Sequence, residues 1–475
     1  MLRIIPIAPP RISATNASNR YSVVSSVTLC VAASPRLCVK PFPSMNPLDA
    51  YTVCAPGLET LVAEELTALG LTVTGTEHGG VALRTNLAGL YRANLGSRIA
   101  TRILLRLVTF RARTFPDLLK HTAALPWKSY LPADTPVTVK AASRASRLYI
   151  LKRIEATVAE AIARRIGATP DEVPDTHTAP LPPPGRRGKK PAPRKSTPPP
   201  PVPLPRRGGM TCPEAMEPSS LPPRGGGTGR GETDQARTPP QQVLVRLVTN
   251  QCTISLDTSG ELLHRRGYRL ATAKAPLRET LACAVLSVCG WQPEMPLLDP
   301  FCGAGTFAIE AARWALCIPP GWERPFAFQS WPSFDERTWE ALLGEAAAAR
   351  RPTVPAPIVA SDRDPGAVRM ARDNAARAGV GDLLTFETRD FFDLCPDGPP
   401  GLVVINAPYG RRVGHGDLRA LYRHVGDHLR GHYRGWSYAM LCGNATLARA
   451  TGLAPDRRLS LLHGGRHVPL VRGRL

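Results

Sequence analysis

The sequence predicts an α/β protein in which a small α+β domain precedes a larger domain built on a mostly parallel sheet. Short apolar runs alternate with helical patterns along much of the 475-residue chain, which is typical of sheets covered by helices. Four of these runs in the second half end in polar residues, as strands of doubly wound domains do beside a ligand. A long stretch rich in Pro, Gly and Arg separates the two regular regions.

These composition changes divide the chain into four segments. We expect an extension over 1–46, the small domain over 47–167, a disordered insert over 168–241 and the larger domain over 242–475. The insert is too rich in Pro, Gly and Arg to bury a core that would offset the entropy of ordering it. It would either hold RNA nonspecifically or only bridge the two domains.

The extension carries basic residues and no acidic residue before Met45. This profile is typical of an organelle transit peptide. However, Met45 directly precedes the first regular segment, so a wrongly assigned start codon explains the extension equally well. We expect a cytoplasmic protein, with the organelle matrix as the alternative if 1–44 is a transit peptide.

The formal net charge of +22 favours a polyanionic partner, above all nucleic acid, because a basic surface attracts phosphates. The alternative is that much of this charge only solvates the insert. The 11 cysteines form no CxxC pair, which indicates free thiols in a reducing compartment. No apolar run is long enough to span a bilayer, and we expect a monomer.

In the small domain, apolar spacing predicts a strand near 51–55, a helix near 58–69 and a later helix from about Lys152 to Arg165. Exposed cations are expected just before that helix, around Tyr149. Arg144, Arg147 and Lys152 are the candidate RNA contacts there. A merely solvated surface is the alternative for each of them.

The larger domain is expected to open with two strand-like runs over 243–257, followed by the segment LHRRGYR and a helix over about 277–288. Cations interleaved with an aromatic ring suit a nucleic-acid strand, because guanidinium groups meet phosphates and a ring stacks on a base. The candidates are Arg265, Arg266, Tyr268 and Arg269. Alternatively, these arginines pair with acidic residues of a neighbouring helix.

Residues 296–312, PLLDPFCGAGTFAIEAA, predict a buried strand that ends at Asp299, a tight loop and an amphipathic helix. Gly303 and Gly305 let the backbone approach a ligand closely. The Lys-Ser/Thr pair of a P-loop and the spacing of the classical dinucleotide fingerprint are both absent from this segment.

Three further strands are predicted, and each ends in a polar group. ASDRDP ends the second strand at Asp362, LLTFETRD ends the third at Asp390, and VVINAPYG ends the fourth at Asn406. A helix is expected after the second strand, over about 366–378. Because carboxyl ends of parallel strands share one sheet edge, we expect these polar groups to line one site.

Taken in this order, the motifs DPFCGAGT, ASDRDP, RD and NAPYG resemble the class I methyltransferases that use S-adenosylmethionine, which have a Rossmann-like fold. With SRASRLY and LHRRGYR…APLRETLA, the chain is similar to the THUMP-domain RNA guanine-N2 methyltransferases, above all the RlmL-type enzymes of large-subunit rRNA. The resemblance covers most of 47–166 and 242–445. It implies a THUMP-like, ferredoxin-like RNA-binding domain before the methyltransferase domain, and an RNA partner.

The resemblance also implies a cofactor site for S-adenosylmethionine. The glycine loop and the strand end before it would shape its methionine end, Asp362 would hold the ribose, and Asp390 would face the adenine. In the loop and its flanks, the expected cofactor-binding residues are Asp299, Phe301, Gly303, Gly305 and Thr306.

The expected catalytic residues are Asn406, Pro408 and Tyr409. The Asn406 side-chain oxygen would accept one N–H of the guanine amine, a backbone carbonyl at Ala407 or Pro408 the other, and Tyr409 would stack on the base. Ala407 departs from the usual Asn-Pro-Pro-Tyr motif, which predicts a less pre-organised loop.

Three alternatives stay open at this point: a tRNA guanine-N2 methyltransferase, a DNA adenine-N6 methyltransferase, and a non-catalytic RNA-binding assembly factor. We expect no metal site. The histidines at positions 415, 424, 428 and 432 fit the polar face of a helix.

Overall fold

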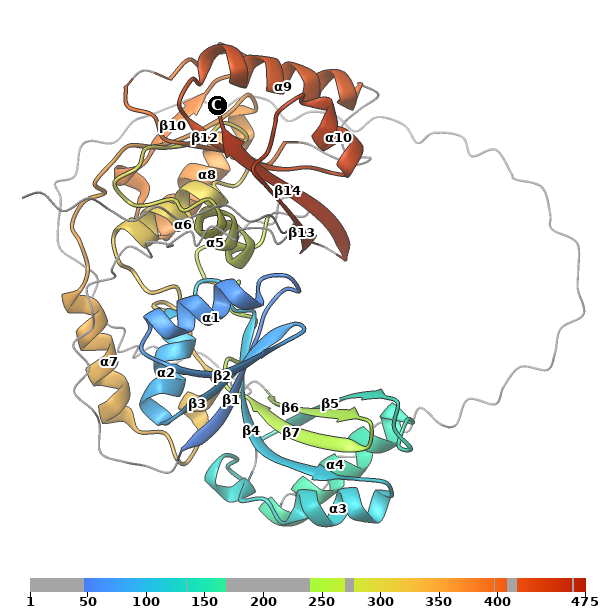
Figure 1. The fold of residues 1–475 in the computed structure, drawn as a ribbon. Coiled ribbons are helices and arrows are strands. Elements are labelled where there is room, and N and C mark those ends of the chain that lie inside the picture. The colour runs from blue at the N-terminus through green and yellow to red at the C-terminus, as the bar shows by residue number, and fades with distance from the viewer. Residues whose placement is uncertain are drawn as a thin grey trace, which may run out of the picture. The chain divides into compact units, whose positions relative to one another are not determined.

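The computed structural model describes residues 47–133, 135–167, 240–269, 277–396, 398–407, 417–463 and 465–475. The predicted extension, nearly all of the predicted insert, Pro408, Tyr409 and His415 lie outside these residues. The described residues form two seven-stranded sheets with helices packed on them, which confirms the predicted α/β class (Figure 1).

The first sheet has the strand order β2-β3-β1-β4-β7-β6-β5. Its neighbouring strands are antiparallel except for β5 and β6, which run parallel. Its strands are β1 (Leu48–Val53), β2 (Thr72–Glu77), β3 (Gly80–Thr85), β4 (Arg102–Arg111), β5 (Val137–Arg144), β6 (Gln241–Val248) and β7 (Gln251–Asp257).

The strands β6 and β7 correct the predicted domain boundary. The composition of the chain predicts that the larger domain begins at 242, but both strands complete the first sheet beside β4 and β5. The two strand-like runs themselves were predicted, and they form a hairpin that turns through Thr249 and Asn250, both with positive φ. The pattern could not show which sheet the hairpin joins, because its partner strands lie more than 90 residues earlier in the chain.

Four helices pack on the first sheet: α1 (Glu59–Ala68), α2 (Leu87–Gly96), α3 (Phe115–Ala123) and α4 (Leu151–Ile166). The helix predicted from about Lys152 to Arg165 is confirmed as α4, and its regularly spaced apolar residues Ile154, Val158 and Ile162 are all buried. Helix α3 starts with a capping box formed by Thr114 and Asp117. Figure 1 shows α3 and α4 side by side along the strands β5 to β7.

The second sheet has the order β10-β9-β8-β11-β12-β14-β13. The strands β8 to β12 are parallel to their neighbours, whereas β13 and β14 form an antiparallel hairpin at one end. The strands are β8 (Leu297–Asp299), β9 (Ile358–Asp362), β10 (Thr385–Thr388), β11 (Leu402–Ile405), β12 (Ser437–Leu441), β13 (Arg457–His463) and β14 (Arg466–Arg474).

The helices of this second half are α5 (Glu279–Val288), α6 (Thr306–Ala315), α7 (Glu336–Ala348), α8 (Pro365–Arg377), α9 (Leu418–His432) and α10 (Ala445–Ala450). The predicted helices after the glycine loop and after the second strand correspond to α6 and α8. Helix α7 was not predicted, although Asp335 caps its first turn and its apolar residues recur at helical spacing.

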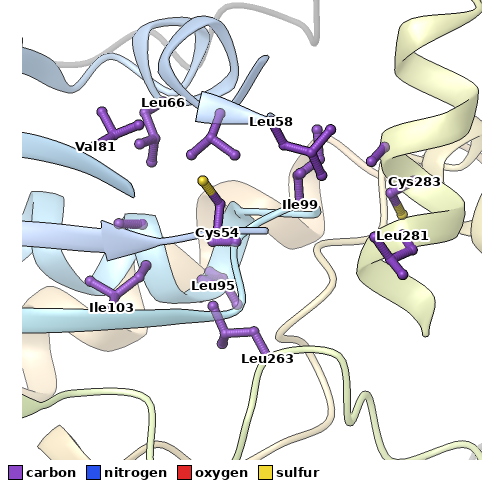
Figure 2. Packing of buried hydrophobic residues seen from close by; sticks show 14 of the residues in the cluster. Cys54, Leu58, Leu66, Val81, Leu95, Ile99, Ile103, Leu263, Leu281 and Cys283 are labelled. Atoms are coloured by element: carbon purple, nitrogen blue, oxygen red, sulfur yellow. The ribbon is translucent and has the colours of Figure 1, made fainter. Parts of the chain in front are cut away.

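Buried apolar side chains form two contact clusters. Figure 2 shows part of the larger one, in which Leu66 lies near Val81 of β3 and Leu58 lies near Ile99, and Leu281 of α5 belongs to the same cluster. The smaller cluster surrounds β11 and α9 and contains Ala407. Burial of these side chains is the main favourable contribution to folding.

Candidate functional site

Four strand ends of the second sheet carry the predicted polar groups. Asp299 and Asp362 are the last residues of β8 and β9, Asn406 directly follows β11, and Asp390 lies two residues beyond β10. These strands are parallel neighbours in the order β10-β9-β8-β11. Their carboxyl ends therefore share one sheet edge, as the sequence predicted, which is where ligands of such sheets bind.

The glycine loop is held against this edge by backbone hydrogen bonds. The Gly303 N–H donates to Asp362 Oδ2 at 3.0 Å, and the Cys302 N–H donates to the Ser361 carbonyl at 2.9 Å. Gly303 and Gly305 both have positive φ, of 51° and 79°, which explains the need for glycine. A Cβ at Gly303 would meet no protein atom within 4 Å, so this part of the loop faces open space.

Asp299 is the most unusual group of the site. Its side chain is 1% exposed, and neither carboxylate oxygen has a hydrogen-bond partner among the described residues. Burial raises its pKa well above the usual range, and the negative charge of Asp362 raises it further. A buried carboxylate without a partner is costly, so a ligand that brings a cation would stabilise it.

Asn406 carries the second buried acceptor without a partner. Its Oδ1 atom is buried and has no hydrogen-bond partner within the described part of the chain. The next residue, Ala407, is fully buried in the smaller apolar cluster. The small side chain at this position therefore packs into the core below the strand end, while the amide oxygen of Asn406 stays available for a donor.

Asp390 and Phe301 form another side of the site. The Asp390 carboxylate accepts a hydrogen bond from the Phe392 N–H at 3.1 Å and caps a short 3-10 turn. Phe301 is half-buried, and its ring centroid lies 5.4 Å from that of buried Phe391. The two rings make this side of the strand ends apolar, which suits the face of a flat heterocycle.

The site residues fit S-adenosylmethionine chemically. The ammonium of its methionine moiety would pair with buried Asp299, and its ribose hydroxyls would donate to Asp362. The open space at Gly303 would hold the rest of the methionine end. The assignment of each residue to one part of the cofactor stays a prediction.

The prediction that Arg266 and Tyr268 bind RNA is wrong, because their side chains are buried, with 1% and 2% exposed. Arg266 donates to the backbone carbonyls of Leu263 and Arg98, both at 2.6 Å. Its Nε lies 3.8 Å from Glu310 Oε2, and the Tyr268 hydroxyl donates to Glu310 Oε1 at 2.9 Å. The alternative weighed from the sequence, arginines paired with acids of a neighbouring helix, applies here.

Arg269 also points into the protein and not toward solvent, so its predicted contact with RNA is wrong too. Its pairing with an acid of a neighbouring helix is the alternative weighed from the sequence, whereas its contact with the start of α6 was not predicted. Its guanidinium lies 3.3 Å from the Glu279 carboxylate of α5 and donates to the Thr306 hydroxyl at 2.5 Å. Thr306 is the first residue of α6, directly after the glycine loop. Arg269 therefore braces the loop, and no local sequence signal distinguishes it from its exposed neighbour Arg265, which pairs with Glu261 on the surface.

The remaining RNA candidates are all exposed: Arg144, Arg147 and Lys152 at the junction of β5 and α4, and Arg265. Nothing in their burial or pairing contradicts contact with phosphates, so they stay predictions. This junction belongs to the first sheet and its helices.

A cavity of about 240 Å³ lies on the second sheet but away from the predicted site. Leu298, Val359, Arg389, Cys395 and Trp436 contribute to its lining, whereas Asp299, the glycine loop and Asn406 do not. The cavity therefore does not coincide with the strand ends that carry the predicted polar groups.

The histidines of α9 make ordinary structural contacts. His428 Nε2 lies 2.9 Å from the Leu394 carbonyl oxygen, and its ring packs edge-on against Phe391. Within the described ranges, no three His, Cys, Asp or Glu side chains are grouped to hold a metal ion. Nor does any helix of these ranges have the length and apolar composition to cross a membrane.

Comparison with known proteins agrees with both halves of the structure. Residues 266–468 match the family described as the RMKL-like methyltransferase domain, and residues 49–104 match the RlmL ferredoxin-like domain. The chain is 31% identical to a putative RNA methyltransferase of Synechocystis sp., over 89% of this chain and 95% of that protein.

Two further similarities are informative. The chain is 31% identical to the ribosomal RNA large subunit methyltransferase K/L of a Marinomonas strain, over 87% of this chain but only 50% of that protein. It therefore spans about half the length of this relative. The solved structure of SMU.472, described as a putative methyltransferase complexed with S-adenosylhomocysteine, has a TM-score of 0.70 at 27% identity and covers 91% of this chain and 99% of its own. The chain thus belongs to the RMKL-like methyltransferase family and uses S-adenosylmethionine as its cofactor.

Proposed function

We propose that this protein transfers a methyl group to the exocyclic N2 atom of guanine in RNA, with large-subunit rRNA as the substrate. The observation that carries this proposal is the buried, unpartnered Oδ1 of Asn406 at the end of β11, beside the strand that carries Asp299 and the glycine loop. An amide oxygen at this place can accept a hydrogen bond from an amine.

The chemistry of the amine explains why an acceptor is needed there. The N2 lone pair of guanine is delocalised into the ring, so it is a poor nucleophile until the amine is held in the right orientation. The cofactor supplies an electrophilic methyl group on a sulfonium centre. Asn406 would fix one N–H and a backbone carbonyl at Ala407 or Pro408 the other, which is catalysis by positioning and electrostatics without a strong general base.

The roles of Pro408 and Tyr409 rest on the sequence alone, because both residues lie outside the described part of the chain. We propose that Tyr409 stacks on the base. Bringing N2 into the site requires the base to leave its helix, at a cost of a few kcal/mol that stacking and hydrogen bonds offset.

Charge and relatedness support RNA as the substrate. The chain carries a formal net charge of +22, and exposed arginines gather on the first sheet's side at Arg144 and Arg147. The related proteins named above are called RNA or ribosomal RNA methyltransferases. Because the chain spans only half of the K/L relative, the rRNA substrate is part of our proposal.

The direct test is the substitution Asn406→Ala in the full-length protein. We expect methyl transfer to RNA to fall by at least about a hundredfold, since a positioning acceptor would be lost, while the affinity for S-adenosylhomocysteine stays nearly unchanged. Arg351→Ala, a substitution of an exposed arginine outside the strand ends, is the matched control and should retain activity. Unchanged activity of the Asn406→Ala protein would refute the assigned role.

The substrate is identified by mass spectrometry of nucleosides from a strain that lacks the gene. Loss of N2-methylguanosine from large-subunit rRNA supports the proposal, whereas loss of the same nucleoside from tRNA shows the tRNA enzyme. Loss of N6-methyladenine from DNA would instead show adenine methylation. Intact nucleosides, combined with a purified protein that does not bind the cofactor, would indicate an assembly factor.

A further inference from the structure

The junction between β5 and α4 exposes an unusual run of apolar side chains. Tyr149, Ile150 and Leu151 are 73%, 48% and 41% exposed. Only two other large apolar residues are exposed in the described ranges, Phe392 and Leu462, and both less so, at 38% and 37%. We call these three consecutive residues the apolar tip. An exposed apolar group of this kind marks a contact surface more often than a scattered single residue does.

Hydrogen bonds hold the chain before the apolar tip in one conformation. The Ser143 hydroxyl donates to the Leu148 carbonyl at 2.6 Å, and the Arg147 N–H donates to Asn250 Oδ1 at 2.8 Å. In return, the Asn250 N–H donates to the Ser146 hydroxyl at 2.9 Å. The side chain of Leu148 is buried. The apolar tip is therefore presented by a fixed loop, which lowers the entropic cost of binding.

Backbone strain is concentrated at the same place. Ala145, Thr249 and Asn250 have φ values of 50°, 50° and 66°. They are three of the four described non-glycine residues with positive φ, the fourth being Cys317. The left-handed conformation costs an L-residue about 1–2 kcal/mol, and strain of this kind clusters at ligand-binding sites.

Positive charge surrounds the apolar tip. Arg144, Arg147 and Lys152 are exposed, and the Lys152 side chain is 92% exposed, with Glu155 as a distant partner at 3.8 Å. The first turn of α4 holds no acidic residue, and Ile150 supplies no side-chain cap. A narrow apolar group with cations on its flanks complements a strand with flat bases and a charged backbone.

We propose that the apolar tip binds an unpaired nucleotide of the RNA substrate, with its base stacked on the Tyr149 ring and its flanking phosphates held by Arg144, Arg147 and Lys152. This inference rests on the proposed function and adds the class of RNA element recognised. A fully paired duplex hides its base faces, so the aromatic ring would distinguish unpaired from paired RNA. Three side chains are too few for a stable protein interface, which buries about 20–30 residues on each side.

The test measures binding of the full-length protein, without cofactor, to two fluorescent RNAs of equal length: a hairpin with an unpaired loop and a blunt duplex. We expect tighter binding of the hairpin. Tyr149→Ala should weaken hairpin binding about 5- to 150-fold, the value of one lost base stack, and leave duplex binding unchanged. Tyr149→Phe should restore hairpin affinity, because the ring is kept.

Two control variants separate the contributions. Leu462→Ala removes an exposed apolar side chain on β13 and should change neither affinity. Arg147→Ala should weaken hairpin and duplex binding alike and reduce the salt dependence of both, because phosphate contacts are common to both RNAs.

Equal affinities of the wild-type protein for the hairpin and the duplex would overturn the proposal. So would a Tyr149→Ala protein that binds the hairpin as tightly as the wild type does, or that loses affinity for the hairpin and the duplex equally. Cosedimentation with phosphatidylserine vesicles that Tyr149→Ala abolishes would overturn it in favour of a membrane contact. Since binding is measured without cofactor, a protein that shows the hairpin preference but modifies no guanine would refute only the proposed function.

Discussion

The loop after β8 contains two glycines with positive φ, Gly303 and Gly305, and we expect alanine to act differently at each. Gly305→Ala should mainly lower the unfolding free energy, whereas Gly303→Ala should mainly weaken cofactor binding. At both positions alanine must adopt a left-handed conformation, which costs about 1–2 kcal/mol of unfolding free energy. At Gly305 the new Cβ would also lie 3.0 Å from the Ala371 Cβ and 3.3 Å from the Ile309 Cδ1 atom. Such overpacking adds about 1–3 kcal/mol. We therefore expect Gly305→Ala to lose about 2–5 kcal/mol and Gly303→Ala only about 1–2 kcal/mol.

Cofactor binding should be affected more directly by Gly303→Ala than by Gly305→Ala. A Cβ at Gly303 meets no protein atom within 4 Å, so it would project into the space that we assign to the cofactor. We expect Gly303→Ala to weaken S-adenosylhomocysteine binding at least about tenfold, which corresponds to about 1.4 kcal/mol, while the protein stays folded. Urea unfolding gives the stability, and isothermal titration calorimetry gives the affinity.

Gly344→Ala is the matched control, since Gly344 is exposed within α7 and an added Cβ has no neighbour within 4 Å. It should raise the unfolding free energy by about 0.5–1 kcal/mol without any effect on affinity. The reasoning is refuted if Gly303→Ala binds the cofactor as the wild type does. Equal stability of the Gly303→Ala and Gly305→Ala proteins would refute the packing argument.

Two other substitutions test the buried charges. Asp299→Asn should stabilise the cofactor-free protein above the usual Asp pKa of about 4: the native pKa is raised, so wild-type stability falls as pH rises from the unfolded to the native pKa. Urea midpoints at several pH values check this, and an advantage of the variant that grows toward acid pH would contradict it. Arg266→Ala should cost about 3–5 kcal/mol, because it leaves buried Glu310 and two carbonyls without their partner. Arg265→Ala should cost at most about 1 kcal/mol, and similar urea midpoints for the two variants would argue against burial of Arg266.

The parts of this fold that the sequence predicted depend on local signals. The strands that end at Asp299, Asp362 and Asn406 are short apolar runs closed by glycine or proline, and the four strand ends meet because parallel strands place their carboxyl ends on one edge. In contrast, the sheet that β6 and β7 join is set by pairing with β4 and β5 across the long insert. No pattern within the two strands contains that information.

The arginines show the same limit for the site. Arg147 and Arg266 both lie in short segments that combine arginines with a tyrosine, and the sequence predicted the same role for both. Arg147 is exposed because its loop is hydrogen-bonded to Asn250 at the end of a hairpin. Arg266 is buried because its positive charge pairs with Glu310 of α6. Each outcome depends on a residue more than 40 positions away, so only the three-dimensional structure separates a surface contact from an internal brace.

The pairing of buried polar groups then distinguishes braces from binding groups. Arg266 donates to two backbone carbonyls and pairs with Glu310, which also accepts from Tyr268. Only the Arg266 Nε of these three side chains lacks a hydrogen-bond partner among the described residues, and its charge is already paired, so a ligand would gain little by replacing these contacts. Asp299 is the described carboxylate with both oxygens buried and unpartnered, and Asn406 has its amide oxygen in the same condition. Leaving such a group unsatisfied costs about 1–3 kcal/mol each. That cost is recovered only when a donor arrives, and both groups stand at neighbouring strand ends where a cationic cofactor and an amine substrate would supply donors together.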